Sequence, residues 1–192
     1  MMQNKIVITG RMASGKSTVS KFIENMGFRV IYADNCAKEI LNRCDIGEVI
    51  ESSFGFCYNS PQFKSEFFKN EKLRDFVNNT VYTILFEKFA KITGEYIFFE
   101  IPLYFESEDI AHKCGFIPTK VVYVSSNEKT RYERLKNKRH MQMDKILERE
   151  KYFLEETAAL LKSDYLIENN GSLQDLKEKT EKFIDEETKK IY

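Results

Sequence analysis

The sequence has few of the residues that build metal centres or disulfide frameworks. It holds four cysteines and two histidines in 192 residues, and no two cysteines form a C-x-x-C pair. A zinc site is therefore not expected, because such sites draw on paired cysteines and histidines. We interpret the four cysteines as buried or free thiols in a reducing cytosol; they are Cys36, Cys44, Cys57 and Cys114.

Neither sign of charge predominates, and long apolar runs are absent. Thirty basic residues balance thirty acidic ones, so the composition favours neither nucleic acid nor an anionic membrane as a partner. No apolar run approaches the roughly 20 residues that span a bilayer. The first residues lack the apolar core and cleavage site of a signal peptide, and repeats and linkers are absent. We therefore expect one compact cytoplasmic domain, a monomer or a weak homo-oligomer.

The most informative motif lies close to the first residue. Gly10-Arg11-Met12-Ala13-Ser14-Gly15-Lys16-Ser17 is a G-x-x-x-x-G-K-S phosphate-binding loop. In such a loop the backbone N–H groups point at a polyphosphate, Lys16 reaches the outer phosphates, and the Ser17 hydroxyl binds Mg²⁺. The predicted ATP-binding residues are Ala13, Ser14, Gly15, Lys16, Ser17 and Thr18, with Ser17 also the metal ligand.

The context of this loop fits the same function. An apolar run, Lys5–Thr9, precedes the loop and predicts a buried strand. The residues after it, from Ser17 to Met26, place apolar side chains at helical spacing, and Gly27 suits the end of that helix. Strand, loop and helix together aim the N-terminus of a helix at an anion.

Strands and helices alternate along the rest of the chain. Apolar runs predict strands at 28–33, 96–101, 120–124 and 164–168. Helical spacing predicts helices at 35–43, 63–91, 106–113, 127–135 and 143–162, and from Ser172 onward, with 48–53 ambiguous. The aromatic stripe of 63–91 is interpreted as core packing, with a substrate pocket as the alternative.

This alternation predicts an α/β fold with a parallel sheet and helices on both faces. Ligands of such sheets bind beyond the carboxyl ends of the strands. Gly10, Asp34 and Glu100-Ile101-Pro102 should therefore surround one crevice.

The remaining motifs narrow the class of nucleotide-binding protein. The guanine-reading N-K-x-D segment of GTPases is absent, and the nearest equivalent of a Walker B strand is Phe98-Phe99-Glu100. The chain is short for a motor ATPase, but its length suits a small-molecule kinase.

Asp34, at the end of the second predicted strand, has two interpretations. A kinase needs a carboxylate there to accept the proton of the attacking hydroxyl or to hold Mg²⁺ through water. Alternatively, Asp34 caps the helix that begins at Asn35, since aspartate favours that position.

A basic cluster also has two interpretations. Arginines of a mobile lid could neutralise the transferred phosphoryl group, or the residues could form a solvated helix end. We favour contact with ATP for at least one of Arg134 and Arg139. The cluster consists of Arg131, Arg134, Lys136, Lys138, Arg139 and His140.

Several segments together resemble the dephospho-coenzyme A kinase family. Besides the loop, these are Gly27–Asp34, Ile101–Glu106, Val121–Val124 with Glu128–Leu135, and Ser163–Gly171. The P-L-x-F-E and D-Y-x-I-x-N-x-G segments in this order are the more specific part of the match, which is dispersed over nearly the whole chain.

The resemblance implies transfer of the γ-phosphoryl group of ATP to the ribose 3′-hydroxyl of dephospho-coenzyme A, with Mg²⁺. It implies a P-loop kinase three-layer sandwich with a central five-stranded parallel sheet. The core would comprise 1–34, 94–135 and 163–192, the helical substrate region about 35–93, and the lid about 136–151. The implied catalytic residues are Asp34, Lys16 and Arg139, and Arg134 would bind ATP.

The sequence departs from the family pattern at several positions. Arg11 stands where the loop usually has a second glycine, and Tyr32 replaces the first aspartate of D-A-D. Asn79–Tyr82 takes the place of H-P-x-I, and the lid has Lys138-Arg139-His140 without a clear glutamine. Two alternatives therefore stay open: a kinase for another metabolite, nucleoside or nucleotide, and an ATP-binding module that has lost catalysis.

Overall fold

The computed structural model describes residues 4–58, 60–67 and 69–188, which divide into two compact units. The first unit comprises Met1–Ile31, Thr93–Glu106 and Pro118–Tyr192, and the second comprises Tyr32–Ile92 and Ser107–Ile117. None of the helices in the described ranges combines the length and apolar character that crossing a bilayer requires.

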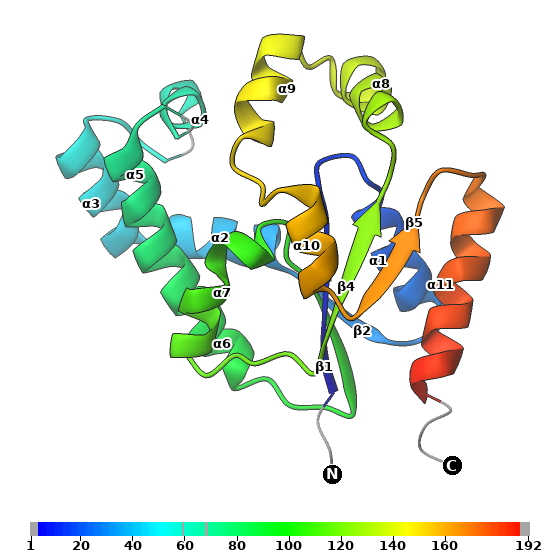
Figure 1. The fold of residues 1–192 in the computed structure, drawn as a ribbon. Helices are drawn as coiled ribbons and strands as arrows, with labels where there is room; N and C mark the ends of the chain where they lie inside the picture. The colour runs from blue at the N-terminus through cyan, green and yellow to red at the C-terminus, as the bar shows by residue number, and fades with distance from the viewer. Residues whose placement is uncertain (1–3, 59, 68, 189–192) are drawn as a thin grey trace. The chain divides into compact units, whose positions relative to one another are not determined.

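A five-stranded parallel sheet is the centre of the first unit (Figure 1). Its spatial order is β2-β3-β1-β4-β5, so β1 lies in the middle and pairs with β3 and β4. The strands are β1 (Asn4–Thr9), β2 (Arg29–Tyr32), β3 (Tyr96–Glu100), β4 (Lys120–Ser125) and β5 (Tyr165–Glu168). All five predicted strands are therefore confirmed, with ends shifted by one residue in most cases.

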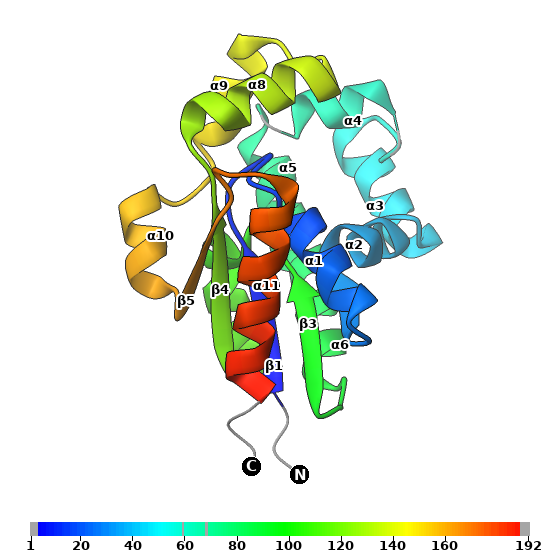
Figure 2. The same ribbon diagram turned by 90° about the vertical axis from the view of Figure 1, so that its right-hand side faces the viewer.

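Helices cover both faces of this sheet. Alternate strand residues such as Ile6, Phe98 and Val122 are buried against α1 (Lys16–Asn25) and α11 (Leu173–Thr188). The short α10 (Glu156–Lys162) contacts β4 from the other side, as the edge-on view of Figure 2 shows. The three-layer α/β architecture is confirmed, because period-two burial along a strand supplies one apolar row to each face.

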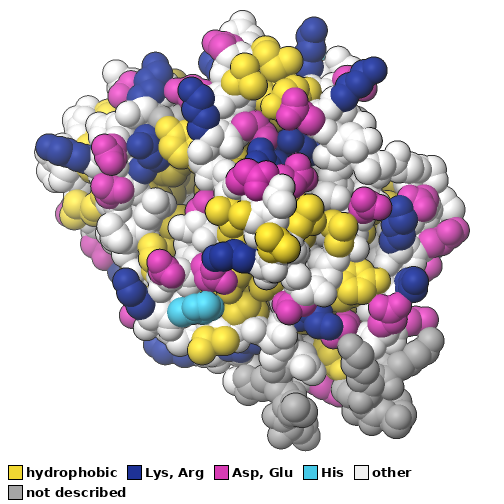
Figure 3. Space-filling model, viewed as in Figure 1, with side chains coloured by type: hydrophobic (Ala, Val, Ile, Leu, Met, Phe, Trp, Pro, Cys, Tyr) yellow, Lys and Arg dark blue, Asp and Glu magenta, His cyan; other side chains and the backbone are white. Residues whose placement is uncertain are grey.

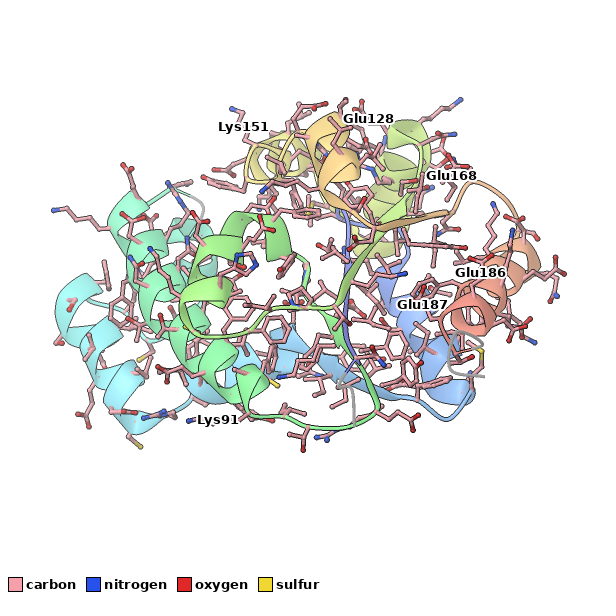
Figure 4. All side chains as sticks on the ribbon, turned by 60° about the horizontal axis from the view of Figure 1, so that its bottom comes forward. Lys91, Glu128, Lys151, Glu168, Glu186 and Glu187 are labelled. Atoms are coloured by element: carbon pink, nitrogen blue, oxygen red, sulfur yellow. The ribbon has the colours of Figure 1, made fainter. Side chains whose placement is uncertain are left out.

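The C-terminal ends of α1 and α11 are fixed by backbone and side-chain contacts. After α1, the N–H of Gly27 bonds the Glu24 carbonyl at 2.9 Å and that of Phe28 bonds Ile23 at 3.3 Å, a Schellman motif with Gly27 at φ +92°. Glu187 lies near the C-terminal end of α11 (Figure 4). Its carboxylate pairs with Lys120 of β4. The predicted end of the first helix at Gly27 is thus confirmed.

The second unit is helical around an aromatic core. The rings of Phe86, Phe89 and Phe116 are buried and contact one another. Leu73, Val77, Val81 and Leu85 are also buried, so the core-packing interpretation of the stripe is confirmed for these residues. The helices are α2 (Ala33–Leu41), α3 (Cys44–Phe54), α4 (Pro61–Glu66), α5 (Glu71–Phe76), the π-helix η1 (Val77–Tyr82) and α6 (Thr83–Ala90), with most of α7 (Tyr104–Lys113).

The prediction of two long continuous helices is wrong, because each stretch is divided into shorter helices. The 63–91 stretch is divided among α4, α5, η1 and α6, with a break before α5 where the Asn70 side chain accepts the Leu73 N–H at 3.1 Å. The 143–162 stretch is divided into α9 (Met143–Glu150) and α10, where Glu155 caps the second helix. Between strands β4 and β5 the first helix is α8 (Glu128–Arg139), which begins one residue later and ends four residues later than predicted.

Candidate phosphate-binding site

The phosphate-binding loop joins β1 to α1 in the first unit. Gly10 and Gly15 have φ values of +143° and +108°, which favour glycine. A Cβ on Gly10 would lie 2.2 Å from the Val124 carbonyl oxygen, and one on Gly15 would lie 2.2 Å from Asn169 Nδ2. Both glycines of the motif are therefore required by conformation and by the close approach of β4 and of the residue after β5.

Five successive carbonyl groups of the loop accept hydrogen bonds from side chains. The donors are Lys16 Nζ to Gly10 at 2.7 Å and Arg11 at 3.0 Å, Arg131 to Met12 at 3.4 Å, Arg134 to Ala13 at 3.1 Å, and Asn169 to Ser14 at 2.7 Å. Because the C=O and N–H of one peptide group point in opposite directions, holding the carbonyls fixes where the following N–H groups point. The loop is thus held in a shape suited to an anion before the anion arrives.

The start of α1 adds to this anion site. Gly15 is the N-cap of α1 and supplies no side-chain cap bond to the amides of the first turn. These amides carry the positive end of the helix dipole, which attracts phosphate. Lys16 is buried and Ser17 is exposed at this turn.

Arg131 and Glu150 form a buried ion pair beside the loop. Arg131 is 1% exposed and donates to both carboxylate oxygens of Glu150, at 2.7 and 3.2 Å. Arg11 reaches the same carboxylate from within the loop, at 2.7 Å. Burial tends to lower the pKa of Arg11, but the hydrogen bond and charge of Glu150 outweigh burial and raise it, so the guanidinium stays charged.

A small hollow lies where β1, β3 and β4 end, beside the loop. Thr9, Pro102 and Tyr123 line it from the strand ends, and Arg11 and Glu106 add charged groups. Burial, with the charge of Glu156, raises the pKa of Tyr123 to about 12, so this phenol is neutral at physiological pH. Burial also raises the pKa of Glu106, while the N–H of Leu154 and the charges of Arg11 and Lys16 act in the opposite direction.

The predicted crevice is reproduced in the first unit only in part. Gly10 and Pro102 line the same hollow, as the strand-end rule predicts. Asp34 belongs to the second unit, where it is an exposed residue in the first turn of α2. The capping interpretation of Asp34 is wrong, because the N-cap is Tyr32 and this helix has no side-chain cap bond. The catalytic role of Asp34 stays a prediction.

The basic cluster does not behave as one solvated helix end. Arg131 and Arg134 lie three residues apart on α8 and both turn towards the loop, while Lys136 and His140 are exposed. The side chains of Lys138 and Arg139 lie outside the described part of the chain. On the face shown in Figure 3, basic and acidic side chains are interspersed and do not gather into one basic patch.

Sequence reasoning missed Glu150 and the role of Asn169. Asn169 lies within the D-Y-x-I-x-N-x-G segment that resembles the family, so the sequence did mark this residue as a candidate. Glu150 had none, because its partners Arg11 and Arg131 are distant in sequence.

The residues at the loop fit a Mg²⁺ ion that is held mainly by phosphate and water. Among the described residues, no group of three histidine, cysteine, aspartate or glutamate side chains forms a metal site. Mg²⁺ bound to nucleotides keeps several waters and takes few protein ligands. The exposed Ser17 hydroxyl at the start of α1 suits that limited role.

The family model and the curated relatives that match this chain carry the same family name. A family model described as dephospho-CoA kinase matches residues 5–175. A dephospho-CoA kinase of Fusobacterium nucleatum is 34% identical over 94% of this chain and 96% of its own length. The solved structure of a dephospho-CoA kinase from Campylobacter jejuni has a TM-score of 0.67 at 22% identity, covering 100% of both chains. A Thermus thermophilus structure reaches a TM-score of 0.78 at 24% identity, covering 97% of this chain and 98% of its own.

Proposed function

Because this chain belongs to the dephospho-CoA kinase family, we propose that it transfers the γ-phosphoryl group of ATP to the ribose 3′-hydroxyl of dephospho-coenzyme A. This reaction is the final step of coenzyme A synthesis. The observation that carries the proposal is the family match over residues 5–175, which includes the loop, α8 and the segment around Asn169. The two alternatives, a kinase for another acceptor and an inactive ATP-binding module, are not favoured by this match.

The donor half of the reaction is assigned to the loop. The N–H groups of residues 13–18 would bind the phosphates of ATP, since the carbonyls on the opposite side of the loop are held by side chains. Lys16 would move from the Gly10 and Arg11 carbonyls to the outer phosphates and stabilise the charge that develops during transfer. Arg134, which donates to the Ala13 carbonyl at 3.1 Å, would bind ATP beside the loop.

Mg²⁺, with Ser17 as its protein ligand, supplies charge neutralisation of the phosphates when it is bound. Asp34 would accept the proton of the attacking hydroxyl, a role for which its exposed carboxylate at the start of α2 is suited. Arg139, near the end of α8, would neutralise the transferred group. Dephospho-coenzyme A is the expected small-molecule partner.

The proposal is tested by ADP release with and without dephospho-coenzyme A. We expect release to depend on this acceptor, and Asp34→Asn to lower kcat by about 100-fold or more while ATP binding stays within about threefold. Asp75→Asn, an exposed aspartate of α5 in the same unit, is the matched control. A clear preference for another acceptor would refute the substrate, and normal turnover by Asp34→Asn would refute the assigned base.

A further inference from the structure

Arg11 connects the phosphate-binding loop to the end of α9. Its Nη1 donates to Glu150 Oε2 at 2.7 Å, and its Nη2 donates to the Leu154 carbonyl at 3.0 Å. The side chain is only 16% exposed. A residue that stands where the family pattern has glycine therefore joins the loop to the segment from Glu150 to Leu154.

Glu150 is also joined to the loop by a second route. Arg131 donates to both oxygens of Glu150 and, at 3.4 Å, to the Met12 carbonyl. The loop thus contacts the last residue of α9 through the Arg11 side chain and through Arg131, and the two routes meet at one carboxylate. Because this carboxylate is buried, loss of either partner changes an interaction that water screens weakly.

A direct contact between Arg11 and the phosphates of ATP is less consistent with these bonds. Both terminal nitrogens of its guanidinium donate to Glu150 and Leu154. To reach a phosphate, Arg11 would have to leave Glu150, which would then keep only one of its two guanidinium partners. The geometry instead favours a role through Glu150.

We propose that Arg11 is a positioning residue that, through Glu150, holds the end of α9 against the phosphate-binding loop. Phosphate binding in the loop and the order of α9 then become coupled. Since lid segments close over the reacting groups in kinases, this coupling should act on the transfer step more than on ATP affinity. The inference rests on the proposed function in taking ATP as the ligand.

The test compares Arg11→Met, Glu150→Gln and the double variant by steady-state kinetics. We expect kcat to fall about tenfold in each single variant and to be no lower in the double variant than in Glu150→Gln, because Arg11 acts through Glu150, whereas Glu150→Gln also weakens the pair with Arg131. The KM for ATP should stay within about threefold in all three. Asp144→Asn, which removes a charge from an exposed position of α9, should leave kcat unchanged.

Hydrogen exchange supplies a readout that a general loss of stability would not give. In the parent chain, a non-hydrolysable ATP analogue should slow exchange of the amides in 143–155, and both single variants should lose most of that nucleotide-dependent slowing. If Arg11→Met does not fold, Arg11→Gly, the residue of the family pattern, takes its place. Thermal unfolding without nucleotide identifies a variant that is merely destabilised.

Three results would overturn the inference. The first is a KM for ATP raised tenfold with kcat unchanged in the single variants, and the second is losses in kcat that multiply in the double variant. The third is nucleotide-dependent slowing of exchange in 143–155 that is the same in the single variants as in the parent chain. The exchange experiment needs only the ATP analogue. A chain that does not phosphorylate dephospho-coenzyme A but shows the coupled slowing would refute the proposed function and leave this inference intact.

Discussion

The side chain of Lys16 is held by carbonyl groups of the phosphate-binding loop to which it belongs. Its ammonium group donates to the carbonyls of Gly10 and Arg11, at 2.7 and 3.0 Å, while its own backbone begins α1. Lys16→Ala removes the charge that would move to the outer phosphates. We expect kcat to fall at least 100-fold, equivalent to about 3 kcal/mol of transition-state stabilisation.

Lys21→Ala, an exposed lysine of the same helix, is the control for the loss of a positive charge and should retain activity. ADP release measures both variants. A loss below tenfold for Lys16→Ala would contradict the assignment of this loop as the donor site.

Asn169 and Asn170 offer a matched pair of substitutions. Asn169 Nδ2 donates to the Ser14 carbonyl at 2.7 Å, whereas Asn170 Oδ1 accepts the Asn127 N–H at 2.8 Å. Asn169→Asp replaces a buried donor with a charge that repels the carbonyl, so we expect ATP-analogue affinity to fall about tenfold. Asn170→Asp keeps an acceptor and should bind normally, and calorimetric titration compares the two. Equal affinities would show that Asn169 does not shape the loop.

The residues of the phosphate-binding loop were predictable to the extent that their chemistry is local. Gly10, Gly15, Lys16 and Ser17 lie within one short motif, so their spacing alone predicted the loop that the structure shows. Glu150 was not predictable in this way, because burial and its pairing with Arg11 and Arg131 arise only when α8 and α9 pack beside the loop. In sequence it is one glutamate of a charged helix.

At the scale of elements, two glycines test how helix ends contribute to stability. Gly27 follows α1 with φ +92°, and no atom lies near the position of an added Cβ. Gly27→Ala should therefore cost about 1 kcal/mol of unfolding free energy through backbone strain alone. Urea unfolding measures this cost.

Gly47→Ala is the control, and its effect on the unfolding free energy should have the opposite sign. Gly47 lies inside α3, where an added Cβ also meets nothing within 4 Å. Alanine should stabilise the helix by about 0.5–1 kcal/mol, since glycine is a poor interior helix former. If both substitutions destabilised the chain equally, the contrast between a positive-φ helix end and a helix interior would be wrong.

The elements themselves were predictable in type but not in continuity. Apolar periodicity at 63–91 and 143–162 correctly predicted helical structure, since these segments bury one side in a core. Apolar periodicity takes no account of the side chains of Asn70 and Glu155, each of which caps a new helix within its stretch. Nor does it distinguish the wider turns of η1 from an α-helix.

At the scale of the whole molecule, Tyr123 makes stability depend on alkaline pH. Its folded pKa of about 12 lies above the usual 10, so the folded state keeps a proton that the unfolded chain loses first. This contribution is fully present below pH 10 and is lost as the pH rises towards 12.

Tyr123→Phe removes that titration. Relative to this variant, the parent chain should lose about 1 kcal/mol of unfolding free energy between pH 9 and pH 11. Urea unfolding at the two pH values measures the difference, which cancels the titration of other groups. A constant difference between the two proteins would show that the phenol titrates normally.

The fold class was predictable because alternating strands and helices leave few arrangements other than a parallel sheet. The strand order β2-β3-β1-β4-β5 was not, because it depends on which distant strands pair. The same applies to the site: the loop is local, whereas the side chains that hold its carbonyls come from α8 and from the end of β5.

The central position of β1 also determines when this strand can pair while the chain is being synthesised. Asn4 pairs with Tyr96 and Ile6 with Lys120, so β1 has no neighbour in the sheet until much of the chain has left the ribosome. At 5–20 residues per second, that delay is about 5–20 s. During this time the phosphate-binding loop follows an unpaired apolar strand, the kind of exposed segment that favours aggregation during synthesis.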